Sequence, residues 1–547
     1  MNEAKLRKVV LALCAAGLVS ASSGVAGAAG GFNQATFASQ AAATKRLTAA
    51  VQMTKDEAAP TRAFTGPTSM LVDPENPRVI VAATADLRTR VCQLVVSTDA
   101  GHIWHFSKSL PAPTAYPSCT NGSAGVAEAS IAWGRNGTLY YALNGFGPGE
   151  GSYSEGHTSM LLARTTDLGG HWTTTVVDDN RGKPSPAASD FGATIAVDTS
   201  GPRDTVYVGF SQLFPDAPPD SPLNNGPVDV AVSTDGGATF GPPVNISDSS
   251  HLTGTIAGKS YPLLMEGFFG APLLTAHAGT VLVVSGSEAP FNNHPPGDSN
   301  FDARYSYAMP QLAARSTDQG KTWTVATMGP PVFAGVGSQT GLGWTAKGGA
   351  KGTFVAAYAG SPDSASSSGA TDVIVQRSTD GGATWTAPVA VDDDTSGQVT
   401  NFYPQLGVAP NGRVDVVWQD TRDQTDYHVQ VRYSYSADGG ATWSHNMQVN
   451  DQPVNFNLGV SFNSDLRQPP GVASASQYAA FGWADTRLGN DLTQTQDNFS
   501  AVAQFSPVPA KTSTVLPVVA AVFAGLVVAG AVLLAVLLLR RRRLTTA

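Results

Sequence analysis

The chain has 547 residues, of which 42% are hydrophobic and only 14% are charged, with 57 glycines and 36 prolines. A disordered chain would be poorer in apolar residues, and a helical bundle or coiled coil would be richer in charged ones. The formal net charge of −9 argues against a nucleic-acid-binding protein, which would carry a basic face. The composition instead favours many short strands joined by turns.

The first 30 residues have the pattern of a secretory signal peptide. Three basic residues, Lys5, Arg7 and Lys8, precede an apolar run over residues 9–19 that is too short to span a bilayer. Small residues at 26–28 match the pattern of a cleavage site. The sequence therefore predicts export.

Residues 31–61 are rich in Ala, Thr and Gln and are expected to form a flexible lead-in. Removal of the signal peptide leaves Cys92 and Cys119 as the two cysteines of the chain. In an exported protein such a pair favours one disulfide, and a reduced buried pair is the alternative.

An eight-residue motif recurs six times between residues 97 and 443. Each copy has Asp at its third position, Gly at its fifth and an aromatic residue at its eighth, and its first residue is Ser or Thr. The hydroxyl and the carboxylate can accept hydrogen bonds from nearby backbone N–H groups, and the Gly can adopt a positive φ. Six copies favour a structural turn over six active sites. The aspartates are Asp99, Asp167, Asp235, Asp318, Asp380 and Asp438.

The motif resembles the Asp box, S-x-D-x-G-x-x-W, of the sialidase and BNR-repeat family, here of a membrane-anchored bacterial type. The resemblance covers residues 62–505 and implies an all-β propeller in which each box joins the third and fourth strands of a blade. A seventh module without a box, with strand-like segments at 479–483 and 500–504, follows the six boxed ones. Family precedent favours six blades, and the module count allows seven. An N-terminal strand could close the last blade.

The resemblance implies a sialidase site made of three arginines, a tyrosine nucleophile with an activating glutamate, and an aspartate acid/base. The first arginine belongs to an F/Y-R-I-P motif, which the segment around Arg62 does not match. Glu266, in an apolar run, would have a shifted pKa if buried; a loop-end Glu facing water is the alternative. Tyr433 and Tyr435 are candidate nucleophiles through their proximity to the sixth box, with packing inside a strand as the alternative. The other glutamates in mid-chain are Glu128, Glu150, Glu155 and Glu288.

A second motif, W-x-D-T-R, occurs at residues 418–422 and 483–487. An Asp–Arg pair at a strand end could bind a carboxylate or a sugar, but recurrence at matching places favours an ion pair between neighbouring blades. The residues concerned are Asp420, Arg422, Asp485 and Arg487.

Three consecutive aspartates, Asp392, Asp393 and Asp394, could coordinate calcium, or could form a solvated turn. Neither a metal nor a cofactor is predicted from the sequence. HExxH, GxSxG, Walker and GxGxxG motifs are absent, so metalloprotease, serine-esterase and nucleotide-dependent classes lack support.

Residues 515–539 carry no charge and are long enough to span a membrane, and four arginines at 540–543 would keep the tail 540–547 in the cytoplasm. Residues 506–514 form a linker. Without the signal and the tail, the ectodomain has a net charge of −15. An anionic ligand would therefore need a local cluster of arginines.

These features predict a single-pass cell-membrane protein whose large extracellular domain contacts glycans or glycoconjugates and no nucleic acid. Two functions follow. One is a sialidase-like glycoside hydrolase of the exo-α-sialidase type, which removes terminal acidic sugars. The other is a catalytically inactive Asp-box propeller that binds glycan or protein. The boxes specify the fold and leave the reaction open.

Overall fold

The computed structural model describes most of the chain between residues 32 and 505. The described residues are 32–37, 46–55, 63–107, 110, 115–119, 129–148, 157–184, 186, 188–214, 216–217, 226–247, 251–256, 259–265, 273–288, 310–334, 341–361, 370–422, 428–459 and 469–505. Among them every regular element is a strand, and no helix is long and apolar enough to cross a membrane. The predicted signal peptide, linker, membrane segment and tail lie outside the described residues.

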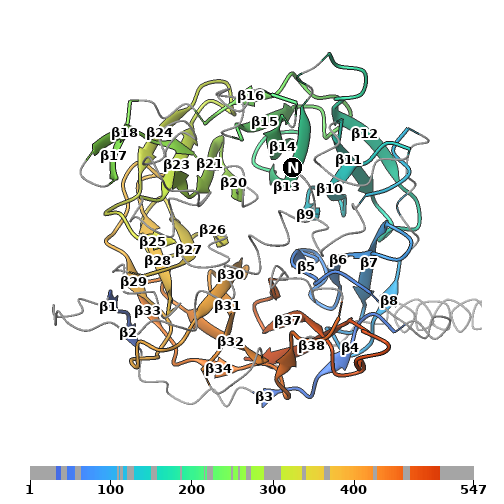
Figure 1. The fold of residues 1–547 in the computed structure, drawn as a ribbon, viewed down its shortest axis with the longest axis vertical. Coiled ribbons are helices and arrows are strands. Elements are labelled where there is room, and N and C mark those ends of the chain that lie inside the picture. The colour runs from blue at the N-terminus through green and yellow to red at the C-terminus, as the bar shows by residue number, and fades with distance from the viewer. Residues whose placement is uncertain are drawn as a thin grey trace, which may run out of the picture. The chain divides into compact units, whose positions relative to one another are not determined.

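The strands form a seven-bladed β-propeller whose blades follow one another around a common axis in chain order (Figure 1). The first strand of each blade lies nearest the axis and the next strands lie progressively further out. Blade 1 consists of β5 (Met70–Val72), β6 (Ile80–Asp86), β7 (Val91–Ser97) and β8 (His105–Phe106). Blade 2 consists of β9 (Ala129–Trp133), β10 (Leu139–Gly145), β11 (Ser159–Thr165) and β12 (Thr173–Asp178). Blade 3 consists of β13 (Ser189–Asp198), β14 (Thr205–Leu213), β15 (Val228–Ser233) and β16 (Val244–Asn245).

The remaining blades are built in the same antiparallel order, with additional short strands at their edges. Blade 4 consists of β20 (Leu273–His277), β21 (Thr280–Ser285), β23 (Leu312–Ser316) and β24 (Thr324–Thr327), and in blade 5 β26 (Gly341–Thr345) and β25 (Phe333–Ala334) both pair with β27 (Thr353–Ser361), which is followed by β28 (Asp372–Ser378) and β29 (Val389–Ala390). Blade 6 consists of β30 (Asn401–Val408), β31 (Val414–Asp420), β32 (His428–Ser436), β34 (Met447–Gln448) and β35 (Val454–Asn455). Blade 7 consists of β36 (Gly471–Ser474), β37 (Tyr478–Asp485) and β38 (Asp497–Gln504). Two further hairpin-like pairs are β17 (Thr253–Ile256) with β18 (Lys259–Pro262) and β19 (Leu264–Met265) with β22 (Ser287–Glu288).

Seven blades correct the six that family precedent favoured. The additional blade is the module without a box, β36, β37 and β38, which a count of boxes misses. Its second strand combines small residues with Tyr478, Phe481 and Trp483, and every residue of β37 is buried. The pattern of burial, and not the turn motif, therefore defines this blade.

The N-terminal segment differs from the flexible lead-in expected from its composition. It contributes β1 (Asn33–Gln34) to blade 5, β2 (Thr36–Phe37) alongside β33 (Thr442–Trp443) at the sixth box, and β3 (Arg46–Leu47) and β4 (Val51–Gln52) to the outer edge of β38. Strands of two residues leave no periodic pattern in a sequence. They form because the outer edges of the blades offer unpaired backbone groups. The last blade is thus closed from the N-terminus, as the sequence suggested.

Each Asp box follows the third strand of its blade and forms the expected turn. In the first box the Ser97 hydroxyl donates to Asp99 Oδ1 at 2.8 Å and accepts the N–H of Gly101 at 2.9 Å. Asp99 Oδ1 also accepts the N–H of Ile103 at 2.9 Å, and Gly101 has a φ of 91°. The same contacts recur in the later boxes, for example around Asp380. The motif is a folding device.

The hydrophobic core is divided among the interfaces between neighbouring blades. The aromatic residue that ends a box packs into the interface between its own blade and the preceding one, as Trp172 does between blades 1 and 2 and Trp443 between blades 5 and 6. Blade 7 has no box, and Phe505 takes this position, with its ring 5.1 Å from that of Tyr435 of blade 6. The guanidinium of Arg413 lies 4.0 Å from the centre of the Phe505 ring.

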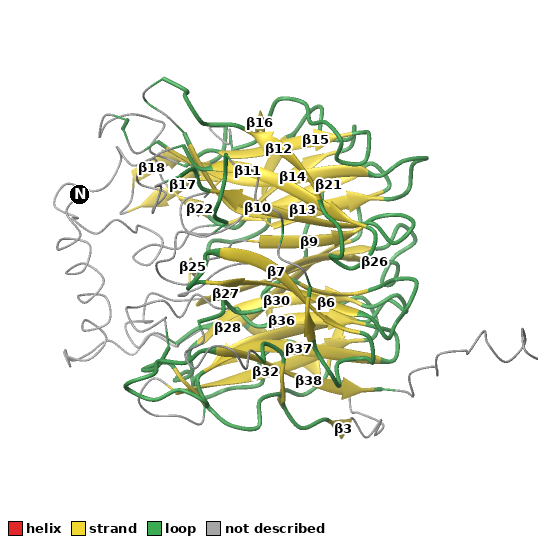
Figure 2. Cartoon of the chain, turned by 90° about the vertical axis from the view of Figure 1, so that its right-hand side faces the viewer, coloured by secondary structure: helices red, strands yellow, loops and turns green. Residues whose placement is uncertain are grey.

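The strands run between two faces of the propeller (Figure 2). The boxes and the turns between first and second strands lie on one face, because successive strands are antiparallel. The loops between second and third strands, and those between blades, lie on the opposite face, called here the box-free face. Side chains at the ends of second and fourth strands and at the starts of first and third strands meet there.

Candidate active site

Five polar side chains gather between blades 2 and 3 on the box-free face. Asp178 ends the fourth strand of blade 2, and Lys183 follows it. Asp190, Gln212 and Asp229 lie at the start of β13, near the end of β14 and at the start of β15. These five residues are called the carboxylate corner.

The strand register explains why three of them share one side of blade 3. Asp190 pairs with Gln212 across β13 and β14, and Asp229 pairs with Phe210, two residues before Gln212. Residues two apart on a strand point to the same side of the sheet. Phe210 packs in the core between blades 2 and 3, so this side of the sheet faces blade 2.

Hydrogen bonds join the corner across the blade interface. Gln212 Nε2 donates to Asp190 Oδ1 at 3.0 Å and to Asp178 Oδ2 at 3.3 Å. Lys183 Nζ donates to Asp178 Oδ1 at 3.1 Å and to Asn180 Oδ1 at 2.7 Å. The side chains of Lys183 and Asp178 are 42% and 13% exposed, whereas Asp190 is fully buried. The corner therefore opens to solvent at Lys183 and is closed at Asp190.

Burial and mutual repulsion perturb the two carboxyls of blade 3. Burial, followed by the negative charge of Asp178, raises the pKa of Asp229 to about 6. The same two causes raise the pKa of Asp190 well above its usual range, and the nearby amides of Asn180 and Gln212 offset this only in part. Both carboxyls of blade 3 thus hold a proton more tightly than an exposed aspartate does, and perturbed carboxyls of this kind are common at catalytic sites.

A buried layer of oxygens lies behind Asp190. Asn144 Nδ2 donates to the backbone oxygen of Asp190 at 2.7 Å, and the N–H of Asp190 donates to the backbone oxygen of Thr158 at 2.9 Å. Asn144 Oδ1, Thr158 Oγ1 and Asp190 Oδ2 are buried and have no hydrogen-bond partner among the described residues. A buried carboxyl oxygen that receives no hydrogen bond disfavours a negative charge on Asp190 and favours its protonated form.

A tyrosine–carboxylate pair lies beside the corner. Tyr116 Oη donates to Asp179 Oδ1 at 2.6 Å, and Arg181 binds both oxygens of Asp179 at 3.0 and 2.8 Å. Burial and the hydrogen bond to Asp179 raise the pKa of Tyr116 to about 12. A raised pKa opposes a role as nucleophile, because the phenolate is then harder to form.

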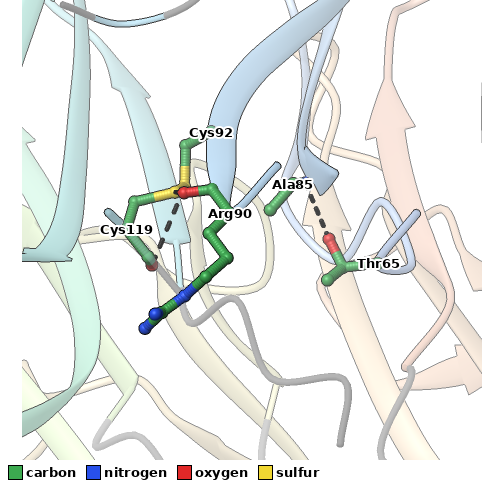
Figure 3. Close-up of a disulfide and its surroundings, with 5 residues drawn as sticks. All are labelled: Thr65, Ala85, Arg90, Cys92 and Cys119. Carbon is green, nitrogen blue, oxygen red and sulfur yellow. Dashed lines mark hydrogen bonds between the residues drawn. A yellow bond between two sulfur atoms is a disulfide. The ribbon is translucent and has the colours of Figure 1, made fainter. Parts of the chain in front are cut away.

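A disulfide between Cys92 and Cys119 fixes the segment that carries Tyr116. It joins the start of β7 to the loop between blades 1 and 2, with the Cα atoms 5.9 Å apart, and Arg90 lies beside it (Figure 3). The N–H of Cys119 also donates to the backbone oxygen of Arg90 at 3.1 Å.

The tyrosines proposed as nucleophiles lie away from the corner. Tyr433 is fully buried in the third strand of blade 6, and its Oη donates to Asp415 Oδ1 at 2.6 Å. Asp415 also pairs with Arg413 at 2.7 Å. Tyr435 lies one residue before the sixth box and packs against the ring of Tyr433. Both tyrosines therefore contribute to packing between blades 6 and 7 near the box face.

The W-x-D-T-R motifs form ion pairs between blades. Arg422 binds Asp393, which follows the last strand of blade 5, and Arg487 binds Asp451 of blade 6 at 2.8 Å. Each arginine also contacts the aspartate of its own motif, Asp420 at 3.2 Å and Asp485 at 2.7 Å. The placement of both arginines matches the alternative of an ion pair between neighbouring blades.

A third copy of the Asp–x–Arg pair occurs in blade 1, where Arg88 binds Asp86 at 2.8 Å. It lacks the Trp and Thr of the other two copies, so the W-x-D-T-R pattern does not detect it. Its position at the end of a second strand is the signal that could have revealed it.

The three consecutive aspartates have separate partners. Asp392 Oδ2 accepts the N–H of Val373 at 2.8 Å, Asp393 binds Arg422, and Asp394 accepts the hydroxyl of Ser396 at 3.0 Å. In the described part of the chain no group of three or more His, Cys, Asp or Glu side chains is arranged to hold a metal ion. These aspartates therefore belong to a turn and a blade contact.

The glutamates named from the sequence cannot be placed against the corner. Glu266 lies outside the described residues, as do Glu128, Glu150, Glu155 and Arg62. Glu288 ends β22. The corner itself was not predicted, because its residues carry no motif and meet only through the register of blades 2 and 3.

Comparisons with known proteins give a likeness of fold. No family model matches the sequence, and a comparison with curated proteins gives no match. Among solved structures, a Penicillium chrysogenum α-L-arabinanase in complex with arabinobiose has a TM-score of 0.41 and 13% sequence identity to this chain. The match covers 85% of this chain and 100% of the arabinanase chain. A Hadza microbial sialidase has a TM-score of 0.42 and 14% sequence identity, and the match covers 78% of this chain and 73% of the sialidase chain.

An ulvan lyase of polysaccharide lyase family PL25 has a TM-score of 0.48 and 10% identity over 84% of this chain and 96% of that chain. The structural neighbours thus include sialidases, arabinanases and arabinofuranosidases, which are β-propeller glycosidases. Their activities are properties of those proteins.

Proposed function

We propose that this protein is a cell-surface glycoside hydrolase whose reaction takes place at the carboxylate corner. The observation that carries the proposal is the meeting of three carboxyls at the interface of blades 2 and 3, where Gln212 joins Asp178 to Asp190 and Lys183 pairs with Asp178. The raised pKa of Asp229, about 6, supports it. Most glycosidases use a pair of carboxyls, one protonated and the other ionised. The predicted signal peptide and membrane segment would place the propeller outside the cell.

Each residue of the corner has a role in this proposal. Asp229 is the general acid that protonates the leaving oxygen, because a carboxyl with a pKa near 6 still carries a proton in weakly acidic medium. Asp178 is the second carboxylate, which acts on the anomeric carbon directly or through water. Gln212 holds Asp178 in place and connects it to Asp190. Asp190 is a positioning residue, because it is fully buried.

The test is release of 4-methylumbelliferone from a panel of glycosides by the full-length protein and its variants. We expect Asp229→Asn and Asp178→Asn each to lower kcat/KM by about 100-fold or more, in the range typical of lost acid–base catalysis. Asp491→Asn makes the same chemical change on an exposed loop of blade 7 and should leave activity unchanged. If both corner variants kept the turnover of the wild type, the proposal would be overturned.

The resemblance to sialidases adds a narrower expectation, an exo-α-sialidase activity on terminal acidic sugars. A sialoside in the same panel tests it. The second candidate function is a catalytically inactive propeller that binds glycan or protein, and the departure of the segment around Arg62 from the F/Y-R-I-P motif favours it. Absence of turnover on every substrate, together with retained binding to a glycan array, would support that candidate.

A further inference from the structure

We propose that a hollow between blades 2 and 3, on the face that carries the boxes, is a carbohydrate-binding site for a neutral, hydroxyl-rich sugar unit. The hollow has a volume of about 330 Å³, and ligand pockets typically measure about 300–1,000 Å³. It lies at the opposite ends of the strands from the carboxylate corner, and binding there does not require hydrolysis at the corner. The polar side chains that line it include Thr138, Tyr140, Arg164, Thr166, His171 and Thr173.

The strand register of blade 2 brings these side chains together. Tyr140, Arg164 and Thr173 are cross-strand partners on β10, β11 and β12, so they share one side of the sheet. Tyr140 packs in the core between blades 2 and 3, so this side faces blade 3. Thr138 precedes β10 and Thr166 follows β11, which places both at the rim of the hollow.

Arg164 reaches from blade 2 to the box of blade 3. Its Nη1 donates to the backbone oxygen of Gly236 at 2.8 Å. Its Nε and Nη2 have no hydrogen-bond partner among the described residues. Within the same part of the chain, the hydroxyls of Thr138, Thr166 and Thr173 also form no hydrogen bond. One guanidinium and three hydroxyls therefore remain available to a ligand.

The rim of the hollow carries a departure from the box pattern. The third to sixth boxes have Thr at their seventh position, and its hydroxyl donates to the box aspartate, as Thr322 does to Asp318 Oδ2 at 2.6 Å. The second box has His171, whose Nδ1 bonds Asp167 Oδ2 at 2.5 Å instead. The ring thus preserves the turn, and its Nε2 has no partner among the described residues in a side chain that is 88% exposed. His171 therefore adds to the hollow a nitrogen that the turn does not use.

The charges around the hollow balance, which favours a neutral ligand. Arg164, Asp204 and Asp235 all act electrostatically on Tyr140. Asp204 also pairs with Arg135 at 3.7 Å. Two arginines thus face two aspartates, so an anionic ligand would gain no net attraction. Sugar hydroxyls both donate and accept hydrogen bonds, which suits a set made of guanidinium N–H groups, threonine hydroxyls and an imidazole nitrogen.

Blade 4 contains an equivalent arginine in different surroundings. Arg315 occupies the place of Arg164, and its Nε donates to the backbone oxygen of Gly381 in the box of blade 5 at 2.7 Å. Its cross-strand partner is Leu282, where blade 2 has Tyr140. The contact of the arginine with the next box is thus common to both blades, whereas the neighbouring Tyr and His are specific to blade 2. Arg315 therefore serves as a control for the structural contribution of Arg164.

The experiment measures binding of the full-length protein to an array of neutral oligosaccharides (glucan, mannan, galactan and xylan) and acidic ones (oligogalacturonate and sialyllactose). Calorimetry then gives Kd for each bound member. We expect a neutral oligosaccharide to bind, and Arg164→Met to raise its Kd at least about tenfold, as for a lost hydrogen bond to a charged group. His171→Thr restores the residue of the later boxes, so the turn should form, and Kd should rise about three- to tenfold. Arg315→Met should leave Kd unchanged.

The outcomes are distinguishable. Weaker binding in Arg164→Met and His171→Thr, with wild-type Kd in Arg315→Met, supports the proposal. Unchanged Kd in both hollow variants overturns it, and if Asp178→Asn weakens binding instead, the sugar is held at the corner and the proposed function stands. Equal weakening in Arg164→Met and Arg315→Met, with no effect of His171→Thr, shows a structural role for the arginines and also overturns it.

Two further results concern the ligand class. Binding of an acidic oligosaccharide as tightly as the neutral ones, or more tightly, overturns the assignment of a neutral sugar. Absence of binding to every member of the array overturns the site itself. Neither result bears on turnover of methylumbelliferyl glycosides, which tests the corner separately.

Discussion

At the residue scale, the three carboxyls of the corner differ in how far they are buried. Asp178 reaches solvent, Asp229 is 7% exposed, and Asp190 is fully enclosed. No pattern of residue types in the sequence distinguishes these aspartates from the many others. The raised pKa values of Asp190 and Asp229 depend on which face of the blade each side chain occupies, and that follows from a strand register that the sequence does not state.

We expect kcat/KM of the wild-type protein to fall as the pH rises through about 6. Asp229 must be protonated to act as an acid, and its raised pKa sets the midpoint of this fall. In Asp229→Asn the remaining activity should lose this dependence, since Asn does not titrate. A pH–rate profile from pH 4 to 8 for both proteins checks this. An unchanged alkaline limb in the variant would assign the acid to another group.

Asp190→Asn should raise the stability of the protein at neutral and alkaline pH. The folded-state pKa of Asp190 lies above its unfolded value, so folding takes up a proton at intermediate pH. The wild type therefore loses stability as the pH rises from the unfolded pKa of about 3.9 to the folded pKa. Asn keeps the oxygen that accepts from Gln212 and removes the charge.

Thermal unfolding of the wild type and Asp190→Asn at pH 4.5 and pH 8 checks the prediction. The difference in Tm should favour the variant at pH 8 and be small at pH 4.5. A variant that is less stable than the wild type at both pH values would show that the carboxyl is ionised and stabilising.

At the element scale, the boxes and the Asp–x–Arg pairs show what can be predicted from a sequence. Both are local: the box uses residues within one turn, and the pair uses residues two apart at the end of a strand. The box motif therefore predicted where third strands end, as at Ser97, and recurrence predicted the ion pairs of Arg422 and Arg487. The corner draws on four strands of two blades and could not be predicted. The two-residue strands β1 to β4 leave no periodicity, so the sequence suggested the closure of the last blade from the N-terminus but not where these strands lie.

Loss of a blade-linking arginine should destabilise the propeller strongly. Asp485 is 1% exposed, and Arg487 binds it at 2.7 Å while reaching Asp451 of the preceding blade. Arg487→Met would leave a buried carboxylate without its cation, which typically costs about 3–5 kcal/mol. Denaturant unfolding of the full-length protein measures the change.

The matched control is Arg181→Met. The pair of Arg181 and Asp179 is about 40% exposed on both sides, and exposed pairs contribute about 0–1 kcal/mol. Equal losses of stability in the two variants would show that burial of the Arg487 pair has no energetic consequence. Such a result would also remove the ion-pair interpretation of the W-x-D-T-R motif.

At the scale of the whole propeller, the corner depends on a closed ring of blades. Blades 2 and 3 are held at a fixed distance by the interfaces that follow around the axis, and the ring is completed where β3 and β4 pair with β38. Every blade interface except that between blades 6 and 7 contains a box aromatic. In the interface between blades 6 and 7 the position of the box aromatic is occupied by Phe505, Tyr433 and the buried pair of Arg413 and Asp415.

Removal of the closing strands should therefore unfold the ring cooperatively. Deletion of residues 46–52 would expose the outer edge of β38 and remove the hydrogen bond that the N–H of Thr48 donates to the backbone oxygen of Val502. We expect a large fall in Tm together with loss of any activity at the corner, about a third of a turn away. Deletion of residues 32–37, which pair with the edges of blades 5 and 6, is the control and should have a smaller effect, because those strands close no blade. If both deletions lowered Tm equally, the N-terminal segment would stabilise all the blade edges that it pairs with to the same extent. Closure of blade 7 would then have no special part in holding blades 2 and 3 together at the corner.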